Sequence, residues 1–526
     1  MKKRTLAVTM SAVMAASMFA SVGVSAEEEF NWKAYEGTTL NVMFNEHTYA
    51  NAIIEKLPEF EEQTGIKVEY STTPEANYFD KLNTALSSRS GQPDIFMTGA
   101  YQTWEYAPAG YMEPLDAYIE DATKTSPDYN YDDFIPGIIN ALRWDLVPGH
   151  AVGEGELWAL PMGWEINTLT YNKKIFEEKG IAAPTTTQEL YDAAVALKEF
   201  GGSGTYGLAV RGLRDWGTIH PAYMSLFATW GEKDFEVEEG KLVCKLDSPE
   251  AIEMTEYWVK LIKDGGAPQW STYGWELCGA DLGAGKAAMM WDADRGGYTQ
   301  NVEGASAEAG NLAFSGIPLP EGKTEQLSNL WTWAMGMNAD SKNKDAAWYF
   351  LQYFTSPEFM LYSGTEGACT DTPRPSVMGS AEYKEIVGQA EGYLESFETV
   401  SANASIFFTP QPYFFECTTM WAETLQDLVI SDTYASTEEA MQTSIAVYNH
   451  HMSVMNTFCT IANEHLDIID AVTRHAVMKS ATFMDKAEHA AIVEEIIDAL
   501  KAEPVCDWKD KKVVLTGITA EPDALL

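Results

Sequence analysis

Segments with strand character alternate with segments of helical periodicity through most of this chain, and this alternation constrains the fold most. Residues 40–44 are predicted to form a strand, apolar residues recur at helical spacing over 53–60, and 66–70 form a second strand. Further strands are predicted at 94–97, 207–210, 287–291 and 333–337. Because strands separated by helices build sheets covered by helices, we predict an α/β architecture with mainly parallel sheets.

Residues 157–190 combine an apolar run, a proline break, a strand-like LTY and the start of a helix. Thr186 and Glu189 have the spacing of a capping box, in which the hydroxyl and the carboxylate each accept a backbone N–H. A second helix is predicted to begin at Ser248 and Pro249 and to end at two glycines, 265 and 266. A third runs from about residue 343 to 354.

The first 26 residues have the composition of a secretory signal peptide. Three basic residues precede an apolar stretch that ends in the small-residue sequence 24–26, VSA. No cysteine lies near this cleavage site, so we expect no lipid anchor. No later stretch approaches the roughly 20 apolar residues of a membrane-spanning helix. We therefore expect an exported, periplasmic or extracellular, soluble protein.

The charge balance disfavours phosphate-rich partners. Once the three basic residues of the signal are removed, the net charge falls from −43 to about −46. Nucleic acids bind proteins largely through Lys and Arg, so we expect no nucleic-acid partner. A neutral or cationic ligand suits this surface better, although heavy acidity can also serve solubility alone.

Six cysteines in an exported chain would permit disulfides, but they show no paired spacing such as CxxC, so their pairing stays open. We expect no metal site and no cofactor.

Residues 39–440 resemble the family 1 extracellular solute-binding proteins that deliver sugars to ABC importers. The resemblance rests on a set of segments taken together: LNVMFNEHTYANAIIEKLPEFEEQTGIKVEY, PDIFMTG, ALPMGWEINTLTYNKKIFEEKGI, GKAAMMWD and WTWAMGMNADSKNKDAAWYFLQYFTSPEF. It implies a protein without enzymatic activity that captures a sugar or polyol between two lobes and presents it to permease subunits. We expect it to work as a monomer.

The resemblance also implies a domain organisation and a hinge. Lobe one would comprise residues 27–160 and 318–375, and lobe two 161–317 and 376–440, as a type II periplasmic-binding-protein fold. Bending would occur at 157–162. The helix from Thr186 would move rigidly with lobe two.

Residues 445–526 have a different composition and resemble a fragment of a 2-hydroxyacyl-CoA dehydratase subunit. They hold five of the eight histidines but only four of the 63 aromatic residues. The dehydratases are cytoplasmic iron–sulfur enzymes, and Cys459 and Cys506 are too few to define a cluster site. We favour a fusion or an assembly artefact over a second activity; the alternative is a helical extension packed on lobe two.

Candidate ligand-binding residues follow predicted strand ends and crossings, where α/β clefts form. A sugar needs aromatic surfaces for its C–H faces and polar groups for its hydroxyls. The candidates are Glu46, His47, Tyr101, Gln102, Trp164, Arg211, Asp215, Trp216, Trp291, Asp292, Trp331 and Trp333. Arg374, between two prolines, is a further candidate because the family resemblance implies that its loop lies at the cleft.

Trp164 is the candidate expected to reach the ligand from the crossing. Trp331 and Trp333 should share one face of their strand, and Trp291 adjoins the acceptor Asp292. The alternative for each tryptophan is core packing, and for each charged residue a solvated surface ion.

Two other function classes stay open on the residues alone. A secreted glycoside hydrolase would also be acidic and rich in tryptophan, and it would need two carboxyl groups about 5 to 9.5 Å apart. A binder of a peptide, amino acid or polyamine would use acidic residues such as Glu46, Asp292 and Asp294 around its ligand.

Overall fold

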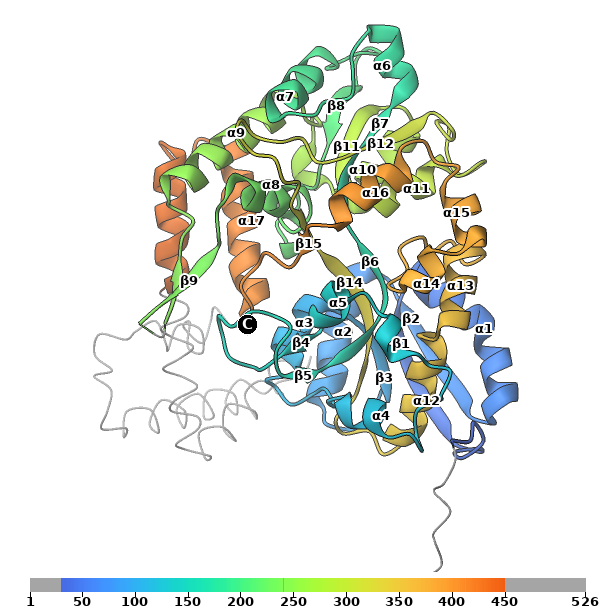
Figure 1. Ribbon diagram of the computed structural model, residues 1–526. Coiled ribbons are helices and arrows are strands. Elements are labelled where there is room, and N and C mark those ends of the chain that lie inside the picture. The colour runs from blue at the N-terminus through green and yellow to red at the C-terminus, as the bar shows by residue number, and fades with distance from the viewer. Residues whose placement is uncertain (1–29, 240, 412, 450–526) are drawn as a thin grey trace, which may run out of the picture.

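A computed structural model describes residues 30–239, 241–411 and 413–449 of the 526-residue chain (Figure 1). The predicted signal peptide, most of the dehydratase-like segment, Cys459 and Cys506 lie outside the described residues. Within the described part, none of the helices is long and apolar enough to cross a bilayer.

Two separate β-sheets organise the molecule, the first in the lower half and the second in the upper half of Figure 1. The first sheet has the order β2 (Lys67–Thr73), β1 (Thr39–Asn45), β3 (Ile95–Gly99), β14 (Trp331–Met337) and β6 (Ala159–Glu165). The second has the order β12 (Leu312–Ser315), β7 (Asn167–Asn172), β11 (Ala287–Ala293) and β8 (Tyr206–Ala209). The predicted two-lobed α/β fold is confirmed.

The sheets are mainly parallel, as predicted, but each is mixed because one of its strands runs opposite to all the others. β1 is parallel to β2 and β3, and β11 is parallel to β8. β14 is antiparallel to β3 and β6, and β7 is antiparallel to β11 and β12. The antiparallel strands β14 and β7 are those that the chain enters directly from the other sheet instead of through a covering helix. A right-handed crossover therefore does not set their direction.

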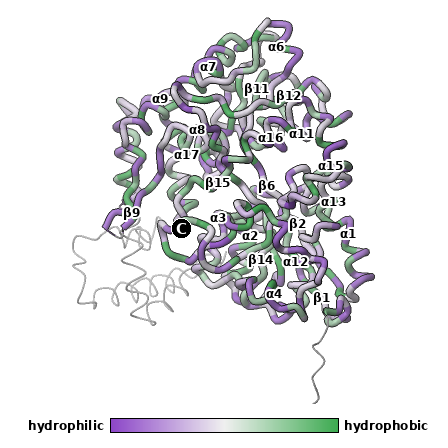
Figure 2. Tube along the Cα trace, viewed as in Figure 1, coloured by the Kyte–Doolittle hydropathy of each residue, from purple (hydrophilic) through white to green (hydrophobic). Residues whose placement is uncertain are grey.

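Helices cover both sheets. Those near the first sheet are α1 (Thr48–Thr64), α2 (Glu75–Ser87), α3 (Ala100–Tyr106), α4 (Asp116–Glu120), α5 (Pro136–Asn140), α12 (Lys344–Phe354), α13 (Pro357–Thr365), α14 (Pro375–Met378) and α15 (Ala381–Val387). Those near the second are α6 (Lys173–Lys179), α7 (Thr187–Ala196), α8 (Ala222–Trp230), α9 (Pro249–Gly265), α10 (Trp275–Gly283), α11 (Asp294–Asn301), α16 (Tyr393–Ser401) and α17 (Phe414–Ile430). Figure 2 shows hydrophilic residues along outer helices such as α1.

Short elements complete the connections. They are the pairs β4 (Arg143–Trp144) with β5 (Glu156–Leu157), β9 (Phe235–Glu238) with β10 (Lys241–Cys244), and β13 (Ser328–Asn329) with β15 (Ala404–Ser405), and the 3₁₀ turns η1 (Tyr131–Asp133), η2 (Trp216–Thr218) and η3 (Trp270–Thr272). The four cysteines of the described part are free and buried.

The chain changes sheet at Ile166. β6 pairs with β14 from Ala159 to Glu165, and β7 begins at Asn167 in the other sheet. Residues 157–162, where bending was expected, therefore lie mostly inside a paired strand. Residues 328–329 pack against α8 and β7, whereas α14 and α15 pack against α13.

The helix starts follow the sequence closely. Thr186 accepts the Glu189 N–H at 3.2 Å and the Glu189 carboxylate accepts the Thr186 N–H at 3.1 Å, so the capping box is present. Ser248 caps α9 through the Ala251 N–H at 3.0 Å.

Replacing Thr186 by alanine should lower the free energy of unfolding by about 1 kcal/mol, because the Glu189 N–H loses its acceptor. Thr186→Ser keeps the hydroxyl and is the matched control. Urea unfolding of the two variants checks this; equal stability would show that water replaces the cap without cost.

Candidate functional site

One cavity of about 670 Å³ lies where the ends of strands from both sheets meet. Its volume falls in the range of small-molecule sites. The first sheet and its helices contribute Glu46, His47, Thr48, Asn51, Thr72, Glu75, Glu165, Trp331 and Trp333, and the second sheet side contributes Arg211, Trp216, His220, Trp275, Met290, Asp292, Ala293, Arg295, Gly296 and Thr299. Two other cavities in the described part, of about 400 and 680 Å³, lack this convergence of strand ends from both sheets.

Trp331 and Trp333 form an aromatic wall on the first-sheet side. Both lie on the same face of β14, as their spacing predicts, and their rings are 5.1 Å apart at 86°. Trp216 approaches the Trp331 ring to 5.2 Å. The Trp333 indole N–H donates to Glu165 Oε1 at 3.2 Å, which fixes both side chains.

Two glycines leave the space that these rings occupy. A Cβ at Gly99 would lie 2.2 Å from the Trp331 ring, and a Cβ at Gly163 would lie 2.1 Å from the Tyr49 ring. The Trp331 and Tyr49 rings can therefore lie directly against the backbone of β3 and β6.

Asp292 and Arg211 form a buried bidentate ion pair on the second-sheet side. Arg211 Nη2 lies 2.6 Å from Asp292 Oδ1, and Arg211 Nε lies 2.9 Å from Oδ2. Burial acts to lower the pKa of Arg211, but the Asp292 carboxylate outweighs it and the pKa is raised. The pair neutralises its own charge and presents oriented oxygens and N–H groups at the cavity wall.

Arg295 is a second buried guanidinium, and among the residues that the structure describes it forms no ion pair with a carboxylate. Its Nη1 lies 3.2 Å from His47 Nε2, and its guanidinium lies 4.9 Å from the Tyr49 ring centroid. Burial, and then the charge of Arg295, keep the pKa of His47 well below its usual value, so this imidazole is neutral. The arrangement leaves Arg295 with donors for an uncharged or anionic acceptor group.

Glu165 is a buried carboxyl group beside the aromatic wall. Burial raises its pKa from 4.5 to about 7, although Arg295 and Arg211 act in the opposite direction. Nearer the cavity mouth, burial also raises the pKa of Glu75. Trp275, 40% exposed, lines the cavity from α10.

Seven of the thirteen predicted residues line this cavity: Glu46, His47, Arg211, Trp216, Asp292, Trp331 and Trp333. The other six do not.

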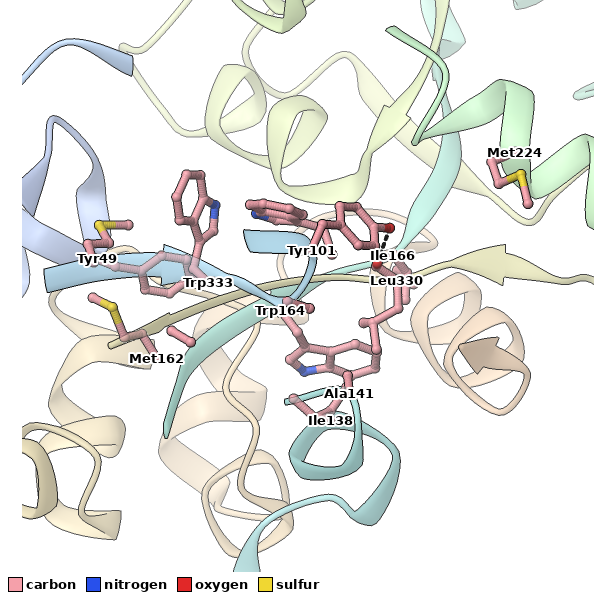
Figure 3. Close-up of a cluster of buried hydrophobic side chains, with 14 of the residues drawn as sticks. Tyr49, Tyr101, Ile138, Ala141, Met162, Trp164, Ile166, Met224, Leu330 and Trp333 are labelled. Carbon is pink, nitrogen blue, oxygen red and sulfur yellow. Dashed lines mark hydrogen bonds between the residues drawn. The ribbon is translucent and has the colours of Figure 1, made fainter. Parts of the chain in front are cut away.

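Trp164 and Trp291 point away from the cavity because side chains alternate along a strand. Glu165 pairs with Trp331 across the sheet and faces the cavity, so its neighbour Trp164 faces the other side. Figure 3 shows Trp164 directed toward Ile138 and Ala141, on the opposite side of the sheet from Trp333. Trp291 likewise alternates with Asp292 and packs 6.4 Å from the Trp258 ring.

The remaining four also lie outside the cavity lining. Tyr101 donates to Leu330 O at 2.8 Å, and Gln102 is buried behind Gly99. Asp215 lies at the start of η2, outside the cavity lining. Arg374 is fully buried and donates to the carbonyls of Thr355 and Asn130 at 2.8 and 2.7 Å.

Four cavity residues were not predicted from the sequence: Glu165, Arg295, His220 and Trp275. Glu165 follows Trp164 in the sequence, and neighbours in a strand face opposite sides, so the choice of Trp164 excluded it. Arg295 lies on α11 and His220 lies in the turn between η2 and α8. Their orientation depends on packing between distant elements, so no local pattern marks them.

Comparison with known proteins agrees with this architecture. Residues 45–360 match the family model for bacterial extracellular solute-binding proteins. The chain is 39% identical over 409 residues, 77% of its length, to an erythritol/L-threitol-binding protein of Mycolicibacterium smegmatis, of which it covers 85%. It is 27% identical over 341 residues, 63% of its length, to a mannitol-binding protein of Pseudomonas aeruginosa, of which it covers 72%.

Solved structures share the fold. A solute-binding protein of Agrobacterium vitis with bound D-mannitol superposes with a TM-score of 0.66 at 22% identity, over 79% of this chain and 98% of that one.

A second family model, the D-component of 2-hydroxyglutaryl-CoA dehydratase, matches residues 397–526. The chain is 49% identical over 87 residues, 16% of its length, to the lactoyl-CoA dehydratase subunit beta of Anaerotignum propionicum and spans only 23% of that relative. The described residues 397–449 nevertheless pack into the upper lobe, where Trp421 contacts Tyr223 and Tyr448 contacts Phe235. The main body of this chain belongs to the bacterial extracellular solute-binding protein family.

Proposed function

We propose that this protein binds an acyclic polyol or a small sugar in the 670 Å³ cavity and delivers it to an ABC importer. The observation that carries the proposal is the pairing of an aromatic wall, Trp331 and Trp333, with the opposed Asp292–Arg211 pair. C–H groups pack on the indole faces while vicinal hydroxyls bridge the carboxylate and guanidinium groups.

The relatives favour a polyol among these ligands. The two relatives described above bind erythritol or L-threitol, and mannitol, by their names. An acyclic polyol offers a row of hydroxyls that each donate and accept, which suits Glu165 and Asp292 as acceptors and Arg295 as donor.

The domain organisation and setting form part of the proposal. Lobe one would hold the first sheet with residues up to Glu165 and α12 to α15, and lobe two the second sheet with α16 and α17. The ligand would close the lobes around the two adjacent, antiparallel crossings at Ile166 and Leu330. We propose an exported monomer that docks to permease subunits and catalyses no reaction.

For the dehydratase-like segment we propose no activity. The mass of the native protein would show whether this segment belongs to the same polypeptide.

Calorimetric titration of the full chain with erythritol, L-threitol, mannitol and maltose tests the ligand class. We expect saturable binding of at least one polyol with higher affinity than maltose. Binding of spermidine alone would point to a cation binder, and release of reducing sugar from an oligosaccharide would point to a hydrolase.

Trp333→Phe should weaken binding of the preferred polyol about tenfold, or about 1.4 kcal/mol, because it removes indole surface and the N–H that orients Glu165. Trp291→Phe is the matched control, since its side chain faces away from the cavity, and it should stay within about twofold. An equal loss in both variants, measured by calorimetry, would argue against this cavity as the site.

Glu165→Gln should weaken polyol binding yet stabilise the ligand-free protein at about pH 8, by at most about 3 kcal/mol. The folded-state pKa of Glu165 lies at about 7, above its usual 4.5. The stabilisation from its proton is therefore present below pH 4.5 and lost as the pH rises through about 7. The gain should fall to about 1 kcal/mol or less at about pH 5, where the folded wild-type carboxyl is largely protonated.

Urea unfolding at the two pH values measures this difference. Glu46→Gln makes the same chemical change at an exposed position of the cavity wall and should show no such pH-dependent gain. A pH-independent difference for Glu165→Gln would mean that its carboxyl is not held in an unfavourable environment.

A further inference from the structure

Two aspartates and one tyrosine from three chain segments meet beside the crossing between the sheets. The Tyr393 hydroxyl, at the start of α16, lies 2.8 Å from Asp294 Oδ2 and 2.5 Å from Asp371 Oδ1. Asp294 begins α11, and Asp371 lies between α13 and α14. The three residues are each at most 1% exposed.

The two short distances from the Tyr393 hydroxyl to the carboxyl oxygens require one proton in addition to that of the phenol. A phenol carries one proton and donates it to one carboxylate only. The second carboxyl oxygen then faces oxygen lone pairs, so its contact is attractive only if that carboxyl group is protonated and donates. Within the described residues no Lys, Arg or His lies close enough to pair with either aspartate; the adjacent Arg295 instead contacts His47 and the Tyr49 ring.

The same aspartates hold the backbone of the crossing. Asp294 Oδ1 accepts the Ile166 N–H at 3.3 Å, and the Asp294 N–H donates to Ile166 O at 2.9 Å. On the other side of Glu165, the Trp164 N–H donates to Asp371 O at 3.1 Å. Both neighbours of the cavity carboxylate are thus fixed by the cluster.

We propose that Asp294 and Asp371 share one proton through Tyr393, and that this shared proton fixes residues 164–166 and thereby positions Glu165 in the cavity. The proposal concerns the ligand-free protein and does not depend on which ligand binds. Its failure would therefore leave the proposed function intact.

The surroundings of the cluster favour the protonated form. Thr370 donates to Asp371 Oδ1 at 3.0 Å, and the charged or titratable neighbours are Glu165, Arg295, Tyr49, Cys369, Tyr298 and Tyr383. Burial is the main cause that raises the pKa of Asp371 to about 6 and that of Asp294 well above its usual value. Because both are raised, the cluster stabilises the fold at low pH and loses this contribution as the pH rises through these pKa values.

Infrared spectroscopy of the full ligand-free chain at about pH 8 tests the shared proton. Carboxyl groups of ordinary pKa are ionised there, and Glu165, with a pKa of about 7, is largely ionised. We expect a protonated-carboxyl carbonyl band in the wild type that is lost in Asp294→Asn and in Asp371→Asn, because the remaining carboxylate then accepts the Tyr393 proton alone. Asp234→Asn is the matched control: Asp234 is equally buried, with a pKa raised by burial to about 6, but it contacts Thr409 away from the crossing. This variant should keep the band.

Absence of the band in the wild type would overturn the proposal, as would its retention in either single cluster variant, since the remaining aspartate would then be protonated alone. Hydrogen exchange tests the positioning role separately. Tyr393→Phe should speed amide exchange of residues 164–166 and leave the β11 strand unchanged. Unchanged exchange at the crossing would show that the cluster does not hold it.

Discussion

The structure depends on two chain crossings that run side by side between the sheets. Asn329, beside the second crossing, has its side chain fully engaged: Nδ2 donates to Tyr101 Oη at 2.7 Å and to His220 O at 2.8 Å, and Oδ1 accepts the Phe407 N–H at 3.0 Å. Asn167 of the first crossing donates to Asn329 O at 2.7 Å. An amide buried here without these partners would cost several kcal/mol, roughly 2 to 7. The cavity walls are the strand ends that these contacts hold together.

Local patterns predicted the elements well because their causes are local. The cap of α9 at Ser248 and the capping box at Thr186 each need only a few residues in sequence, and both are present. The strand direction was not predictable in this way. β7 and β14 are antiparallel to neighbours because the chain reaches them from the other sheet, and this connection appears in no short segment.

The candidate site was predicted in part, and the two misplaced tryptophans share one physical cause. Choosing Trp164 and Trp291 by their position at strand ends ignored the two-residue repeat of side-chain direction. Their neighbours Glu165 and Asp292 face the cavity instead. Arg374 was expected at the cleft because of the family resemblance. It lies outside the cavity lining instead, where its guanidinium donates to the carbonyls of Thr355 and Asn130. Arg295 could be found only from the packing of α11 against the first sheet side, where it meets His47.

Gly99 and Gly163 make room for aromatic rings at and behind the cavity wall. The Trp331 and Tyr49 rings occupy the volumes where side chains of β3 and β6 would otherwise stand. The shape of the cavity therefore depends partly on the absence of side chains at these two positions. Replacing either glycine by alanine would reshape the cavity without altering any residue that lines it. Substitutions at these two glycines are therefore the changes by which the ligand specificity of this protein could shift with the fewest mutations.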